Sequence, residues 1–161
     1  MAYDQIYQIT TEPLSADEYI TENDFIEHWF VGAISDGVSG RDIDRDEEIR
    51  FFREWLEKKK VALFSNDDSF FIMPGGKEKY FKDAFTKFRE AATKATDMTI
   101  EEFAGGSDCT ELVRIISTSF CEKFGPYVSS DEFYTMSLDK FIRESEIGKR
   151  YYINGILQYH W

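Results

Sequence analysis

The segment 77–96 constrains the fold most, because it carries a helical pattern twenty residues long that begins directly after the turn at 74–76. Phe81, Phe85 and Phe88 lie four and three residues apart along it. This spacing places the three rings on one face of an α-helix. We therefore expect the longest helix of the protein here, with the three phenylalanines as core residues.

Other segments carry the capping residues and charges typical of helices. In 44–59, acidic residues occupy the first turn and lysines the last, which matches the helix dipole at both ends. Ser107 or Asp108 can cap a helix that ends at Gly125. Further helices are expected at 22–34, 44–59, 99–103 and 137–145.

Three segments have the pattern of strands and hairpins. Residues 3–11 form a first strand, and 61–64 and 70–73 form a hairpin around an Asn-Asp-Asp turn. Asn154-Gly155 between two β-rich runs predicts a closing hairpin over 151–161. A two-stranded hairpin is marginal alone, so we expect the first strand to pair with it.

Together these elements predict an α+β fold. A small antiparallel sheet, made of the N-terminal strand and the two hairpins, packs against the three longer helices. The length fits one globular domain over residues 1–161. A division into two subdomains near Gly105-Gly106 is the alternative.

The charge of the chain is concentrated at its beginning. The first 48 residues hold 13 acidic side chains against two arginines, a balance of −11, whereas the remainder has 18 acidic and 17 basic residues, a balance of −1. Such asymmetry bears on partners and solubility rather than on the fold. An electronegative surface repels nucleic acid and attracts basic proteins.

The cysteines and the hydropathy pattern indicate the compartment. Cys109 and Cys121 fall within one expected helix, about 18 Å apart at a rise of 1.5 Å per residue, which is beyond disulfide reach. We expect both to be free core thiols. No apolar run approaches the length of a membrane span, and the first residues lack the basic region of a secretory signal. These features predict a cytoplasmic protein.

Motifs that could carry catalysis or bind a metal are incomplete. A calcium loop beginning at Asp42 would need glycine and glutamate where Glu47 and Arg53 stand. The Pro-Gly-Gly-Lys turn at 74–77 lacks the spacing of a Walker loop. His28 and His160 have no cysteine pairs to complete a zinc site. We expect no catalytic residue, no metal and no cofactor.

The last third of the chain resembles the ArdA antirestriction family. The resemblance rests on Ser107-Asp108-Cys109 opening a helix that ends at Gly125, on 138–142 followed by Gly148-Lys149-Arg150, and on the closing hairpin. ArdA proteins are acidic, elongated mimics of duplex DNA that occupy the DNA groove of restriction enzymes. The resemblance implies a non-enzymatic inhibitor.

The charge pattern and the resemblance together predict an inhibitor from a phage or mobile element, of antirestriction or anti-CRISPR type. It would bind a basic, nucleic-acid-binding protein by mimicry, without binding nucleic acid or a membrane itself. The alternatives are a protein-interaction or immunity module and a small enzyme with an aromatic-lined pocket. The residues expected to bind the partner are the carboxylates Glu18, Glu22, Asp24, Glu27, Asp36, Asp42, Asp44, Asp46, Glu47 and Glu48.

Overall fold

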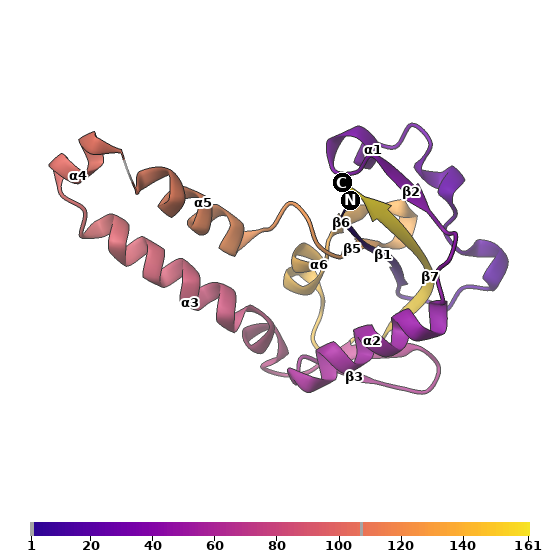
Figure 1. Ribbon diagram of the computed structural model, residues 1–161. Coiled ribbons are helices and arrows are strands. Elements are labelled where there is room, and N and C mark those ends of the chain that lie inside the picture. The colour runs from indigo at the N-terminus through magenta and orange to yellow at the C-terminus, as the bar shows by residue number, and fades with distance from the viewer. Residues whose placement is uncertain (1, 107) are drawn as a thin grey trace.

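The computed structural model describes residues 2–106 and 108–161, and it consists of a β-sheet body from which a long helical arm projects (Figure 1). The two described ends of the chain lie side by side on the body, where the Trp161 amide donates to the Ala2 carbonyl. The predicted α+β class is confirmed.

Within the described residues the body holds a curled sheet of seven strands in the order β3-β4-β7-β1-β5-β6, with β2 paired to β7. The strands β1 and β5 are parallel, and the other pairs are antiparallel. Their bounds are β1 Tyr3–Thr10, β2 Gly37–Ser39, β3 Ala62–Phe64, β4 Ser69–Ile72, β5 Tyr127–Ser129, β6 Thr135–Ser137 and β7 Tyr151–His160.

The helices divide between the body and the arm. In the body, α2 and α6 cover one face of the sheet, and the short helices η2 and α1 lie near β2. The arm consists of α3, α4 and α5. The bounds are η1 Ala16–Glu18, η2 Glu22–Phe25, α1 Phe30–Ala33, α2 Arg45–Lys58, α3 Gly76–Thr96, α4 Ile100–Gly105, α5 Cys109–Phe120, η3 Asp131–Phe133 and α6 Leu138–Glu144.

The sheet has an apolar core on each face because side chains alternate along its strands. In β1, Tyr7 and Ile9 join the larger cluster beneath α2 and α6, whereas Ile6 joins the smaller cluster around Phe30. Phe52 of α2 is surrounded by the rings of Tyr7, Phe64 and Phe70 in the larger cluster. The aromatic residues of the chain therefore hold the body together.

The predicted pairing of the first strand with the C-terminal segment is confirmed, but the closing hairpin is wrong. Residues 151–160 form one continuous strand that pairs with β1 along most of its length. Between the pairs Tyr7–Ile156 and Ile9–Ile153, β7 has one residue more than β1, so Asn154-Gly155 form a β-bulge. The bulge changes which face each side chain meets, since Ile153 and Ile156 both join the larger cluster.

The helix expected over 22–34 also needs correction. The segment 22–34 is not one helix, because Glu27 and Gly32 adopt positive φ and divide it into η2 and α1. After α1, residues 37–39 form the short strand β2, which pairs with the end of β7. Ser107 lies outside the described residues, and Asp108 precedes α5.

The helices α3 and α5 pack against each other rather than over the sheet. Phe85 is exposed and Phe81 and Phe88 are only half-buried, so the prediction that all three are core residues is wrong. Of the three, Phe81 packs against the larger cluster of the body. The spacing correctly identified a helix face, but α5 alone is too narrow to cover it. Cys121, also expected in the core, is exposed just after α5.

The helix α6 anchors the base of the arm. The Arg143 guanidinium lies 4.0 Å from the ring centre of Phe81 and 4.4 Å from that of Phe120, and it donates to the Phe120 carbonyl at 2.7 Å. Tyr80 donates its hydroxyl proton to Asp139 at 2.8 Å. Gly105 and Gly106, the alternative subdomain boundary, lie at the far tip of the arm, where Gly106 ends α4 with a left-handed φ.

Candidate interaction surfaces

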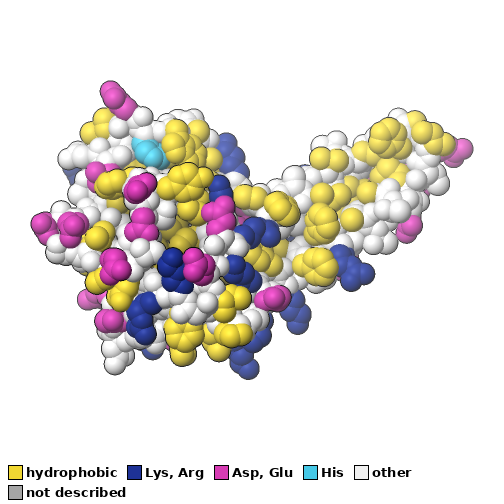
Figure 2. Space-filling model, turned by 180° about the vertical axis from the view of Figure 1, so that it is seen from behind, with side chains coloured by type: hydrophobic (Ala, Val, Ile, Leu, Met, Phe, Trp, Pro, Cys, Tyr) yellow, Lys and Arg dark blue, Asp and Glu magenta, His cyan; other side chains and the backbone are white. Residues whose placement is uncertain are grey.

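The carboxylates predicted to bind a partner all belong to the body. Nine are exposed, and Glu48 is half-buried. They lie on η1 and η2, in the turns around α1 and β2, and at the beginning of α2. In the view of Figure 2, acidic side chains are spread across the body with apolar and basic side chains between them.

Several of these carboxylates also stabilise the local backbone. Glu18 accepts hydrogen bonds from the amide and hydroxyl of Ser15, which lower the pKa of its carboxyl. Asp24 makes the same pair of bonds with Thr21. Asp44 is the N-cap of α2 and accepts from the Glu47 amide at 3.1 Å. These groups form the capping bonds expected at helix N-termini.

Glu22 connects η2 to the chain that follows β2. Its Oε1 accepts from the Gly40 amide at 2.8 Å and from the Ser39 hydroxyl at 3.3 Å. Substituting Glu22, Glu18 or Asp24 would therefore disturb the backbone as well as the charge.

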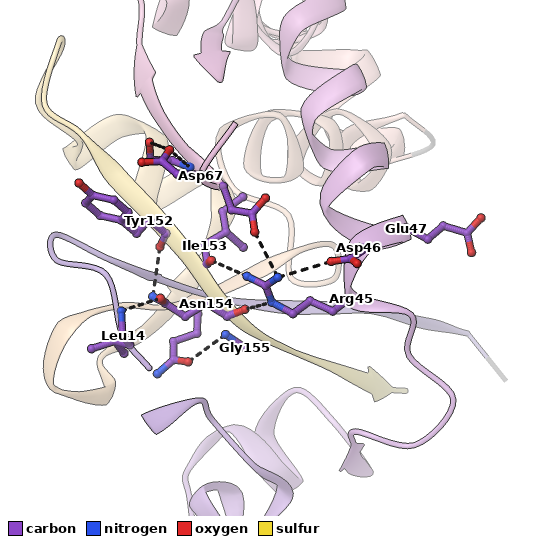
Figure 3. Close-up of polar contacts among 12 residues, drawn as sticks. Leu14, Arg45, Asp46, Glu47, Asp67, Tyr152, Ile153, Asn154 and Gly155 are labelled. Carbon is purple, nitrogen blue, oxygen red and sulfur yellow. Dashed lines mark hydrogen bonds and ion pairs between the residues drawn. The ribbon is translucent and has the colours of Figure 1, made fainter. Parts of the chain in front are cut away.

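Arg45 pairs with one of these carboxylates, Asp46, and it also joins α2 to the bulge in β7 (Figure 3). Its Nε donates to the Asn154 carbonyl at 2.6 Å, and one terminal nitrogen donates to the Ile153 carbonyl at 2.9 Å. The other terminal nitrogen lies 3.2 Å from Asp68 and 3.6 Å from Asp46. Arg45 is therefore a structural cation rather than part of the outer surface.

Glu47 points away from this network in Figure 3 and pairs instead with the exposed Arg50 at 3.2 Å. Glu48 faces inward, and its partial burial, followed by the neighbouring charges of Glu47 and Asp4, raises the pKa of its carboxyl. Of the two, Glu47 is the more available to a partner.

Glu27, Asp36 and Asp42 have exposed side chains that make no hydrogen bond or ion pair with the rest of the described chain. Glu27 and Asp42 each have a φ of +62°, which places them at tight turns. Together with Asp46 and Glu47, these side chains are the acidic groups best placed to meet a partner.

The arm presents a second surface, which the sequence reasoning missed. Figure 2 shows apolar side chains along the arm from the body to the tip. Its large exposed apolar residues have between 57% and 77% of their surface in contact with solvent, and they are Phe85, Ile100, Phe103, Val113 and Phe120. The sequence does contain a signal for these exposed residues, because both arm helices carry more apolar positions than one helix–helix contact can cover.

The angle between the arm and the body contains a cavity of about 390 Å³. Trp55, Tyr80 and Phe81 line it together with the cations Lys87 and Arg114. Burial, and then the charge of Asp139, raise the pKa of Tyr80 well above its usual range, so this phenol stays neutral and only donates a hydrogen bond to Asp139. The lining includes neither histidine nor either cysteine of the described chain.

The other motifs considered in the sequence have a structural explanation or form no site within the described chain. Among residues 2–106 and 108–161, no three His, Cys, Asp or Glu side chains form a possible metal site. The turn at 74–77 is explained by packing, because a Cβ at Gly76 would overlap the Val61 carbonyl oxygen. His28 accepts from the Phe30 amide at 3.2 Å, a local contact within its own turn.

No helix in the described part of the chain is long and apolar enough to cross a lipid bilayer. Comparisons of the chain with protein-family models, with curated proteins and with solved structures found no match.

Proposed function

We propose that the protein is a non-enzymatic inhibitor from a phage or mobile element that acts in the cytoplasm on a nucleic-acid-binding defence enzyme. Its acidic body would occupy the basic surface on which that enzyme holds nucleic acid. The observation that carries the proposal is the exposure of nine of the ten carboxylates between residues 18 and 48. The sequence resemblance of the last third of the chain to the ArdA family points to the same class of function, although a single strand, β7, replaces the hairpin expected there.

Charge density gives this proposal its physical basis. Duplex DNA presents one negative charge per about 1.7 Å of its axis, and proteins hold it mainly through lysine and arginine. A mimic needs separate exposed carboxylates, each contributing at most about 1 kcal/mol in water. The Glu27, Asp36, Asp42, Asp46 and Glu47 side chains fit this requirement, whereas Glu18, Asp24 and Asp44 are held in capping bonds.

The exposed apolar residues of the arm favour a second candidate function, a protein-interaction or immunity module. Apolar patches of this kind mark protein interfaces on otherwise polar surfaces. A partner bound through the arm alone would stay bound at high salt, whereas a partner bound through carboxylates would be released. Salt dependence therefore separates the two candidates.

The test is affinity capture from a bacterial lysate at low and high salt, with competition by duplex DNA. The informative variant carries Glu27→Gln, Asp36→Asn, Asp42→Asn and Glu47→Gln, which removes four charges without touching a capping carboxylate. The matched control carries Glu54→Gln, Glu78→Gln, Glu90→Gln and Glu132→Gln, four exposed carboxylates elsewhere in the chain.

We expect the protein to capture a nucleic-acid-binding enzyme that salt and duplex DNA release, and the informative variant to lose it while the control retains it. Capture that is equal for both variants and insensitive to salt would refute the mimicry proposal and favour the interaction module.

A further inference from the structure

The arm has an uncovered apolar face that runs across both of its long helices. Phe85 of α3 and Phe120 of α5 line one small cavity of about 210 Å³ together with Phe81 and Phe88. Val113 lies seven residues before Phe120, which is two helical turns, so the two residues share a face of α5. Two helices packed as a pair bury only the strip between them, and the remaining apolar surface requires another layer.

Charge divides the arm along its length. The tip, residues 97–111, has five acidic residues and no lysine or arginine, whereas α3 has six basic residues and three acidic ones. Lys82 and Arg89 flank Phe85 on the outer side of α3, and the Arg89 guanidinium lies 5.8 Å from the Phe85 ring centre. The arm is therefore acidic at one end and basic along its shaft.

We infer that this apolar face binds the arm of a second copy of the chain, with the two arms antiparallel. In that orientation the acidic tip of each arm lies against the basic shaft of the other, and the contact is repeated by two-fold symmetry. A parallel arrangement would place tip against tip and shaft against shaft, so that like charges meet. The inference goes beyond the proposed function and does not depend on it.

The size of the surface suits such a pairing. Each of the five exposed apolar side chains of the arm presents on the order of 100 Å², about half of a fully exposed aromatic residue. Covering them in both copies would remove roughly 1,000 Å² from water, which is near the lower limit for a specific interface. We therefore expect a dimer that dissociates on dilution.

The first experiment measures the mass of the full-length protein by light scattering and sedimentation over a series of concentrations. The variant Phe85→Gln/Phe120→Gln is expected to be monomeric at every concentration. Phe51→Gln is the matched control, since Phe51 is also a helical phenylalanine with about the same exposure (51%) but lies on α2 in the body. Circular dichroism establishes that each variant is folded.

The second experiment tests the orientation by exchanging charges. Lys82→Glu/Arg89→Glu makes the shaft acidic, and Asp97→Lys/Glu101→Lys makes the tip basic. Each variant alone is expected to lose the dimer, because like charges then meet at both ends. An equimolar mixture of the two is expected to recover it as a mixed dimer.

A wild-type protein that remains a monomer at the highest soluble concentration would overturn the inference and leave the face to a different protein. A dimer that Phe51→Gln weakens as much as the arm variant would also overturn it, by placing the contact on the body. Because the four carboxylates of the mimicry test all lie on the body, loss of partner capture and loss of the dimer can be observed separately.

Discussion

Arg45 lies in the most acidic part of the chain, yet its side chain turns inward to the bulge of β7. The guanidinium satisfies the carbonyls of Ile153 and Asn154 and the carboxylate of Asp68. A single residue thereby holds the first turn of α2 against the strand that organises the sheet. The proposed partner-binding surface therefore begins outside Arg45, at residues such as Asp42 and Glu47.

We predict that Arg45→Ala lowers the free energy of unfolding by about 3 kcal/mol, because hydrogen bonds to a charged donor are lost and two carbonyls lose their partner. Arg50→Ala, five residues further along α2, removes only an exposed pair with Glu47 and should cost at most about 1 kcal/mol. Urea denaturation of both variants provides the measurement. Equal losses would contradict the structural role of Arg45.

Asp4 makes the stability of the protein depend on pH. Burial of its carboxyl raises the pKa above the ordinary value, in spite of an opposing hydrogen bond from the Gln5 amide. The folded state therefore binds a proton more tightly than the unfolded state, and stability falls as pH rises through the ordinary pKa toward the raised one. At neutral pH the ionised, partly buried group is destabilising.

Asp4→Asn should therefore raise the melting temperature at neutral pH, and the gain should vanish below a pH of about 4, where Asp4 is protonated in both states. Glu18→Gln serves as a control of opposite sign. The hydrogen bonds from Ser15 lower the pKa of Glu18. Its contribution to stability is therefore present above the ordinary pKa and is lost as the pH falls through the lowered pKa of the folded state. A gain for Asp4→Asn that is independent of pH would exclude the electrostatic explanation.

At the scale of elements, the features that local chemistry determines were predictable. The caps Asp44, Thr99 and Ser137 precede α2, α4 and α6 as the sequence indicates, and each accepts a hydrogen bond from a first-turn amide. The hairpin of β3 and β4 likewise follows from its turn residues. In each case the signal and the contact lie within a few residues of each other.

Asn154-Gly155 shows why the remainder was not predictable. The side-chain Nδ2 of Asn154 donates to the Thr10 hydroxyl, and its Oδ1 accepts from the Leu14 backbone amide. A Cβ at Gly155 would lie 3.0 Å from the Ile20 backbone nitrogen. These residues are used for contacts with the first twenty residues of the chain, not for a turn. A dipeptide that favours a tight turn also suits a bulge, and only the distant partner decides between them.

The short strands and the roles of the acidic residues were also set by contacts that are distant in the sequence. The strands β2, β5 and β6 have three residues each, too few to show an alternating pattern. The exposure of the acidic residues could be predicted from their type, but their division into capping groups and free groups could not. For α3, the spacing of Phe81, Phe85 and Phe88 identified the face but not the neighbour that covers it.

At the scale of the whole molecule, the body and the arm have separate apolar interiors. Among the described residues between 82 and 126, none belongs to either core cluster of the body, and the arm residues packed against the larger cluster are Tyr80 and Phe81. The arm instead buries Ala91 and Leu112 in its own contact between α3 and α5. The long excursion from β4 to β5 is therefore an insertion into a sheet that is complete without it.

This separation predicts that the arm can be shortened without unfolding the body. The variant deletes residues 85–118 and joins Ala84 to Ser119, which line the same small cavity, through a short glycine-serine linker. It keeps Phe81, Phe120 and Arg143, the residues that fix the base of the arm to α6.

We expect the shortened protein to retain cooperative unfolding and the near-ultraviolet circular dichroism of its aromatic core. Its free energy of unfolding should change by less than about 2 kcal/mol, because shortening a loop alters its closure entropy by only about 0.6 kcal/mol per twofold change in length. It should also be monomeric, since the self-association face is gone, while still binding a partner that recognises the acidic body. A shortened protein that loses its cooperative transition would show that the arm is part of the folding unit, and the two-part description of the molecule would then be wrong.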